Sequence, residues 1–117
     1  MWDIELFTTA DGKEVVADFL DSLPLKHRAK AIWEIELLAV QGIGLTLPYA
    51  KHIGGELWEL RIKFASDISR IFYFIPVQNK IVLLHGFVKK TDKTPPGEIE
   101  IAKKRILDYK RRYSHEL

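Results

Sequence analysis

Residues 57–64 read LWELRIKF, and this stretch decides the fold class. Apolar and polar side chains alternate along it. One set is Trp58, Leu60, Ile62 and Phe64, and the other is Glu59, Arg61 and Lys63. Successive side chains of a β-strand point to opposite faces, so the pattern predicts a strand with one face against a core. We therefore expect a sheet in the second half of the chain.

Two further strands follow in the sequence. Residues 70–75 read RIFYFI and residues 81–88 read IVLLHGFV, and both are nearly continuous apolar runs. Runs of this kind are typical of central strands that are covered on both faces. The connections at 65–67 and 77–79 are short, so the three strands are predicted to form an antiparallel meander.

The first half predicts a short strand and two helices. Residues 2–6 alternate as a half-buried strand, a helix ends near Ser22, and a second helix runs from Pro24 to Gly42. The predicted buried stripe of this second helix is Ala29, Ile32, Trp33, Leu37 and Val40. We expect the two helices to form an antiparallel hairpin that packs on the sheet.

A last helix is predicted after Thr94-Pro95-Pro96, with basic side chains on its outer faces. The expected order is βααβββα. This is an α+β fold in a single domain over residues 1–117, with an antiparallel meander sheet packed against a helical hairpin and a basic C-terminal helix.

Composition excludes several classes of protein. The chain has 117 residues, of which 47% are apolar and 29% charged, and it has no cysteine. Thiol catalysis, thiolate zinc sites and disulfides are therefore ruled out. No apolar run approaches the roughly 20 residues that a membrane-spanning helix needs, and the N-terminus lacks the basic start of a signal peptide. We expect a cytoplasmic protein with no membrane partner.

The charges are unevenly distributed. Residues 1–50 hold 4 Lys/Arg against 8 Asp/Glu, whereas residues 51–117 hold 14 against 8. The second half is the part that could bind phosphates. A dipolar molecule with well-solvated charged faces explains the counts equally well.

The sequence offers no recognisable metal or nucleotide site. The histidines at 27, 52, 85 and 115 show no metal-ligand spacing, and the glycines do not form a phosphate loop. No cofactor or metal is expected.

Cations on the predicted strands are the remaining candidates for chemistry. Arg61 lies on the polar face of its strand, Arg70 opens an apolar strand, and Lys89-Lys90 follow the last strand. An ion pair with Glu59 or Asp67 explains either arginine taken alone equally well. Taken together, such cations suit RNA cleavage by the neighbouring 2′-hydroxyl, because the substrate supplies the nucleophile. His85 lies in an apolar strand and is a further possible site residue, with packing an equally good explanation.

The sequence resembles the RelE/ParE superfamily of type II toxins, and within it the phage-derived HigB-like branch. The resemblance covers nearly the whole chain and rests on Lys51, LWELR at 57–61, RIFYF at 70–74 and LLHGFVKKTDKTP at 83–95. It implies a toxin that cuts messenger RNA in the ribosomal A site. It also implies inhibition by a cognate helix-turn-helix antitoxin. The toxin is expected to be held on operator DNA only through this antitoxin.

The resemblance also implies roles for individual residues. Arg61 resembles the arginine that stabilises the transition state, and Arg70 resembles the second arginine of the site. Lys89 and Lys90 resemble basic residues that contact substrate or protonate the leaving oxygen. Lys51 resembles a lysine that acts as a base or a phosphate clamp. Some relatives have an aromatic residue where this chain has Ser69, which argues against base stacking at that position.

The remaining site residues are those of the last helix. Lys110, Arg111 and Arg112 are the expected substrate-binding cations, in contact with ribosomal RNA or with an acidic antitoxin segment. Two alternatives stay open: a ParE-like inhibitor of DNA gyrase, and a non-catalytic nucleic-acid-binding module.

Overall fold

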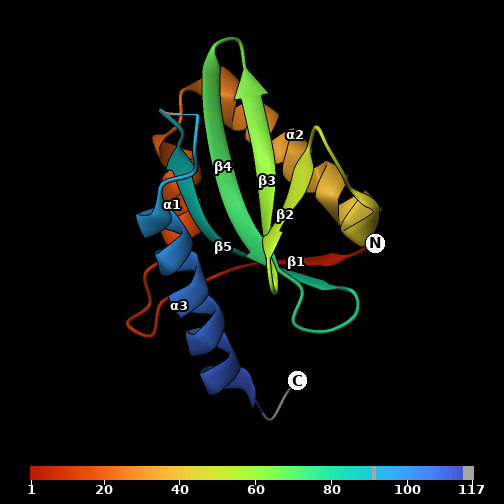
Figure 1. The fold of residues 1–117 in the computed structure, drawn as a ribbon, viewed down its shortest axis with the longest axis vertical. Coiled ribbons are helices and arrows are strands. Elements are labelled where there is room, and N and C mark those ends of the chain that lie inside the picture. The colour runs from red at the N-terminus through yellow and green to blue at the C-terminus, as the bar shows by residue number, and fades with distance from the viewer. Residues whose placement is uncertain (91, 115–117) are drawn as a thin grey trace.

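The stretch LWELRIKF forms the strand β3 (Leu57–Phe64) at the bounds expected from its alternation. The structure is a computed structural model that describes residues 1–90 and 92–114 (Figure 1). It contains a five-stranded sheet and three α-helices. The other elements are β1 (Asp3–Leu6), α1 (Val15–Ser22), α2 (Leu25–Gln41), the 3-10 turn η1 (Gly42–Gly44), β2 (Ala50–Gly54), β4 (Asp67–Phe74), β5 (Lys80–Val88) and α3 (Pro96–Tyr113). The α+β prediction is confirmed.

The sheet has the strand order β1-β5-β4-β3-β2. Strands β3, β4 and β5 form the expected antiparallel meander, and β1 pairs in parallel with β5. The edge strand β2, which pairs antiparallel with β3, is an addition to the expected order. It is short and carries polar residues at Lys51 and His52, so it has neither the apolar run nor the alternation that identified the other strands.

The two faces of the sheet have different covers. Helices α1 and α2 lie behind the sheet in Figure 1, and α3 lies in front of it. The core between the sheet and α1/α2 includes Val16, Leu38, Leu60, Ile62 and Ile71. The core between the sheet and α3 includes Leu57, Phe72, Phe74, Leu84 and Ile106.

The predicted buried stripe of α2 was wrong at four of its five positions, whereas Leu37 is partly buried against the core as expected. Ile32, Trp33 and Val40 are between 43% and 58% exposed, and Ala29 is also exposed. The buried residues of α2 are His27, Ala31, Glu34, Leu38 and Ala39. Two polar side chains therefore belong to the buried face, where His27 hydrogen-bonds the Ser69 hydroxyl at 2.7 Å and Glu34 pairs with Lys30 at 3.3 Å. Because these buried residues are polar, the spacing of the apolar residues predicted the wrong buried face of the helix.

Close packing of α1 on β5 depends on Gly86. A Cβ atom at this position would lie 2.2 Å from the Cδ2 atom of Phe19 on α1, too close for any real contact. The glycine in the HGF segment of β5 therefore has a steric role, because it lets an aromatic ring of α1 rest directly on the strand.

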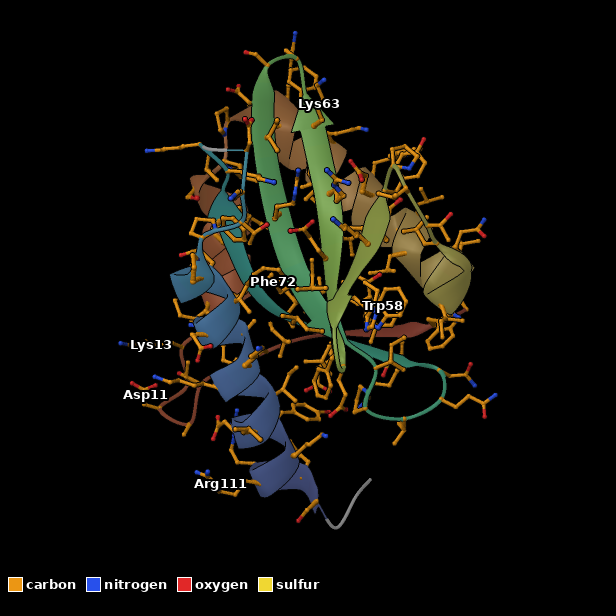
Figure 2. All side chains as sticks on the ribbon, viewed as in Figure 1. Asp11, Lys13, Trp58, Lys63, Phe72 and Arg111 are labelled. Carbon is orange, nitrogen blue, oxygen red and sulfur yellow. The ribbon has the colours of Figure 1, made fainter. Side chains whose placement is uncertain are left out.

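Helix α3 leaves part of its sheet face open. It packs against β5 and β4, whereas the hairpin of β3 and β4 extends beyond its N-terminal end in Figure 1. Lys63, near the tip of that hairpin in Figure 2, is exposed. The open area next to the start of α3 is where the strand-borne cations gather.

Candidate functional site

Strand register places the predicted site residues on one face. Arg61 on β3 lies directly opposite Arg70 on β4, and Lys51 on β2 lies opposite Glu59 on β3. Directly opposed residues share a face, as do residues two apart in a strand, so all four side chains lie on the α3 side of the sheet. Phe72, two residues after Arg70, lies in the core beneath α3.

Lys89 joins this group from the end of β5. Phe87 is the register partner of Arg70, and the Lys89 N–H donates to the Ile68 carbonyl at 2.8 Å, which continues the pairing by one residue. Lys89 is half-buried, and its ammonium group interacts with the charges of Lys51, Glu59, Arg61 and Arg70. We call Lys51, Arg61, Arg70 and Lys89 the cation cluster.

A buried carboxylate lies at the centre of the cation cluster. Glu59 is 2% exposed, and its Oε1 atom lies 3.4 Å from the Nε atom of Arg70 and 3.9 Å from that of Arg61. Its Oε2 atom accepts a hydrogen bond of 3.3 Å from the Thr94 hydroxyl, which comes from the segment before α3. The expected ion pair of an arginine with Glu59 is therefore present for Arg70, at shorter range than for Arg61.

The two arginines differ in exposure. The Arg70 side chain is 5% exposed and donates through Nη1 to the Ser69 carbonyl at 3.1 Å, while the Arg61 side chain is 32% exposed. Both line a hollow of about 380 Å³. The other lining residues are Leu47, Pro48, Lys63 and Ile68. Of the two arginines, Arg61 is therefore the more accessible from solvent.

The electrostatics of the cation cluster act on Lys89. Burial is the main cause that lowers the pKa of the Lys89 ammonium below its usual value, and the positive charge of Arg70 is the next. Arg61 and Lys51 act in the same direction, whereas Glu59 opposes them. A lysine whose pKa is lowered towards neutrality gives up a proton more readily, which suits a general acid.

Lys90 lies apart from the cation cluster. It is exposed and lines a separate shallow hollow of about 270 Å³ next to Phe87 and Pro95. Lys89 is thus the lysine that the fold brings next to Arg61 and Arg70. The sequence Lys89-Lys90 alone does not show which of the two lysines lies there.

His85 is engaged in attaching α3 to β5. Its Nε2 atom lies 2.9 Å from the Glu98 carboxylate, and its Nδ1 atom lies 3.2 Å from Nη1 of Arg105. Arginine can only donate, so Nδ1 is the acceptor and Nε2 carries the proton. Burial lowers the pKa of His85, although Glu98 opposes this. Both ring nitrogens are occupied by α3, which accords with the packing interpretation.

The cations of the last helix lie far from the cation cluster. Arg111 is at the opposite end of the molecule from Lys63 in Figure 2. Lys110 pairs with Glu56, and Arg112 pairs with Asp108 at 3.0 Å and donates to the Thr8 carbonyl at 2.6 Å. The exposed Arg111 is therefore the one of the three that points freely into solvent. These three residues form a second basic area and do not complete the first.

A larger hollow lies elsewhere. About 590 Å³ in volume, it lies between the β2–β3 turn and α3 and is lined mainly by apolar residues such as Ile53, Leu57 and Ile99. The site is assigned to the smaller hollow because convergent charges, and not volume, are what phosphate chemistry requires.

The other histidines have structural contacts. His27 bonds Ser69, which faces α2 and is fully buried, so position 69 offers nothing for base stacking. His52 contacts the Gly55 carbonyl at 2.7 Å, and His115 lies outside the described residues. Within residues 1–90 and 92–114, no group of three or more His, Asp or Glu side chains could hold a metal ion.

The sequence pointed to Glu59 only as an ion-pair partner of an arginine, and it gave Thr94 no role in the site. Glu59 shares the strand face of Arg61 in LWELR, and this alternation was the available signal. Thr94 had no such signal, because only the fold brings the segment before α3 next to β3.

Comparison with known families decides the class of protein. The family described as Phage derived protein Gp49-like (DUF891) matches residues 18–107, which include the whole cation cluster. The chain belongs to this Gp49-like family. The Gp49-like family is a toxin-like family of the RelE/HigB type, and a toxin of this kind has an antitoxin partner. No curated protein matches the chain. None of the described helices is long and apolar enough to cross a membrane.

Proposed function

We propose that this Gp49-like protein is a HigB-like toxin that cuts messenger RNA on the ribosome. The observation that carries the proposal is the convergence of cations on an open sheet face, where Arg61 and Arg70 line one hollow and Lys89 interacts with the charges of both. A protein that only occupied a surface on another protein would not need convergent phosphate ligands.

The reaction is transesterification within the RNA. The 2′-oxygen forms a bond to the adjacent phosphorus and the bond to the 5′-oxygen breaks, which leaves a 2′,3′-cyclic phosphate and a 5′-hydroxyl. The proton of the 2′-hydroxyl passes to a base, and the leaving 5′-oxygen takes up a proton. The protein has to orient the phosphate, neutralise its growing charge and supply that proton.

Each cation has a task in this scheme. Arg61, which is partly exposed and lines the hollow, binds the non-bridging phosphate oxygens with its planar fork. Arg70 adds positive charge from behind. Lys89 protonates the leaving 5′-oxygen, because burial and its cationic neighbours weaken its hold on the proton. The exposed Lys51 is a phosphate clamp at the β2 edge.

The proposed function also implies the macromolecules that the protein contacts. Cations on the outer face of α3, including Lys110 and Arg111, contact ribosomal RNA without reading its sequence. The antitoxin is a helix-turn-helix protein, and operator DNA is contacted only through it. The chain acts in the cytoplasm, where its substrate is.

Expression of the full chain with induction under tight control tests the proposal. We expect growth arrest, with messages cut inside translated codons when cellular RNA is mapped by primer extension. Intact messages together with gyrase-linked DNA breaks would favour the ParE-like alternative. Binding of RNA without any cut would favour the non-catalytic module.

A further inference from the structure

Glu59 is an unusual residue for the interior of a small domain. Glutamate is almost never fully buried unless it is paired, yet this side chain is 2% exposed in a sheet face that also holds Phe72 and Phe74. Its carboxylate contacts Arg61 on the same strand, and it connects β3 to β4 through Arg70 and to the segment before α3 through Thr94.

Stability does not explain this arrangement well. A buried ion pair loses so much hydration that apolar residues of similar volume often serve as well or better. The neighbouring positions of the same face show that this sheet accepts apolar side chains. The contribution of Glu59 therefore lies in geometry.

We propose that Glu59 is a positioning residue that fixes the guanidinium groups of Arg61 and Arg70 for phosphate binding. This inference rests on the proposed nuclease function and adds a residue to its site. Glu59 itself does not touch the substrate, since it is buried beneath the arginines and both of its oxygens have partners. A donor that is already oriented stabilises the transition state without reorganisation, which is how Glu59 contributes to the rate.

Charge balance supports the same role. The groups that face Lys89 are Lys51 on β2, Glu59 and Arg61 on β3, and Arg70 on β4. Of these only Glu59 is negative, and it keeps the pKa of Lys89 from falling further. Moving this carboxylate away would lower the pKa of Lys89 further. It would also leave the side chains of Arg61 and Arg70 less firmly oriented.

The test uses two mild variants of the full-length protein. Glu59→Asp keeps the charge but shortens the side chain by one methylene, and Thr94→Val removes the hydrogen bond to Oε2 with little change in shape. Single-turnover cleavage on saturated ribosomes should fall by about 10²-fold in Glu59→Asp, the loss typical of a misplacement of about 1 Å. It should fall by about three- to tenfold in Thr94→Val, the value of one hydrogen bond. Ribosome affinity should not change in either.

Glu36→Asp is the matched control. It is the same chemical change at an exposed glutamate of α2, on the opposite side of the sheet from the cation cluster. It should leave both rate and affinity at the wild-type values. The alkaline limb of the pH–rate profile should move to lower pH in Glu59→Asp and stay in place in the control.

A second readout does not depend on nuclease activity. In the ¹⁵N–¹H spectrum of the free protein, the Nε–H groups of Arg61 and Arg70 should give distinct signals, and that of the buried Arg70 should exchange slowly with water. Glu59→Asp and Thr94→Val should shift these signals and speed the exchange of Arg70. If Glu59→Asp does not fold, the cleavage rate and the arginine signals are both measured on Thr94→Val.

Folded variants with wild-type cleavage rates and unchanged arginine signals would overturn the inference. A wild-type protein that cuts no message would refute the proposed function instead. In that case the arginine signals still decide whether Glu59 holds the two guanidinium groups.

Discussion

Arg61 and Arg70 lie directly opposite each other on β3 and β4, but the first is accessible and the second is buried against Glu59. In the proposed mechanism the two arginines therefore have different roles. Arg61 binds the phosphate in the hollow that both side chains line, and Arg70 adds positive charge from behind.

Replacement of Arg61 tests this division. Arg61→Ala should lower single-turnover cleavage by about 10²–10³-fold, the loss seen when one transition-state donor is removed. Affinity for the ribosome should stay the same, because the lost interaction forms in the transition state. Lys13→Ala, which removes an exposed cation far from the hollow, is the control and should have no effect. An equal loss of affinity and rate in Arg61→Ala would make Arg61 an ordinary phosphate clamp.

The basic area of α3 should behave in the opposite way. Combined replacement of Lys110, Arg111 and Arg112 by alanine should reduce ribosome affinity and its dependence on salt, while bound complexes still cleave. Lys110 and Arg112 also have partners within the protein, so stability must be measured in parallel. A cleaner variant replaces the exposed Lys103, Lys104 and Arg111. Unchanged salt dependence in that variant would rule out this helix as the ribosome-binding surface.

Antitoxin binding separates two modes of inhibition. We expect inhibition by bulk, in which the antitoxin packs on another face and leaves the cation cluster at least partly exposed. The charge reversal Lys89→Glu/Lys90→Glu should then change the affinity for the cognate antitoxin by no more than about 0.5 kcal/mol. A loss of about 2–5 kcal/mol, typical of broken buried charge pairs, would show that the antitoxin covers the site.

His85 makes stability depend on pH. Burial lowers its pKa below the ordinary value of 6.5, so below that pH the unfolded chain binds a proton that the folded protein resists. The free energy of unfolding should therefore fall as the pH drops from about 7 to about 5, and His85→Gln should remove part of that slope. Urea unfolding at several pH values measures it, with the exposed His52→Gln as control. The same slope in His85→Gln and wild type would contradict this account of His85.

The local sequence pattern predicted an element correctly where the burial of each residue follows from its own polarity. The alternation in 57–64 gave β3 its bounds and placed Glu59 and Arg61 on one face. It failed for the buried face of α2, because two polar residues are buried there: His27 bonds Ser69 on β4, and Glu34 pairs with Lys30 one turn earlier in the same helix. It also failed for β2, which is a strand only because β3 offers an edge to pair with.

The candidate site was predictable in its residue types and less so in its geometry. Strand register places Arg61 opposite Arg70, and Lys89 interacts with the charges of both, while the catalytic roles of these residues stay a prediction. The choice of Lys89 over Lys90 and the burial of Arg70 depend on the end of β5 and the course of the chain before α3. The closing hydrogen bond from Thr94 to Glu59 spans 35 residues of sequence, beyond the reach of any local pattern.

The most direct measurement of the central claim uses a message with one altered sugar. Ribosomes are programmed with an mRNA that carries a 2′-deoxynucleotide at the position cut by the wild-type protein, and the matched all-ribose message is the reference. The all-ribose message should give fragments that end in a 2′,3′-cyclic phosphate and begin with a 5′-hydroxyl. The deoxy message should stay intact at that position while the protein still binds the ribosome. Cleavage of both messages at the same rate would contradict attack by the 2′-hydroxyl and with it the proposed mechanism.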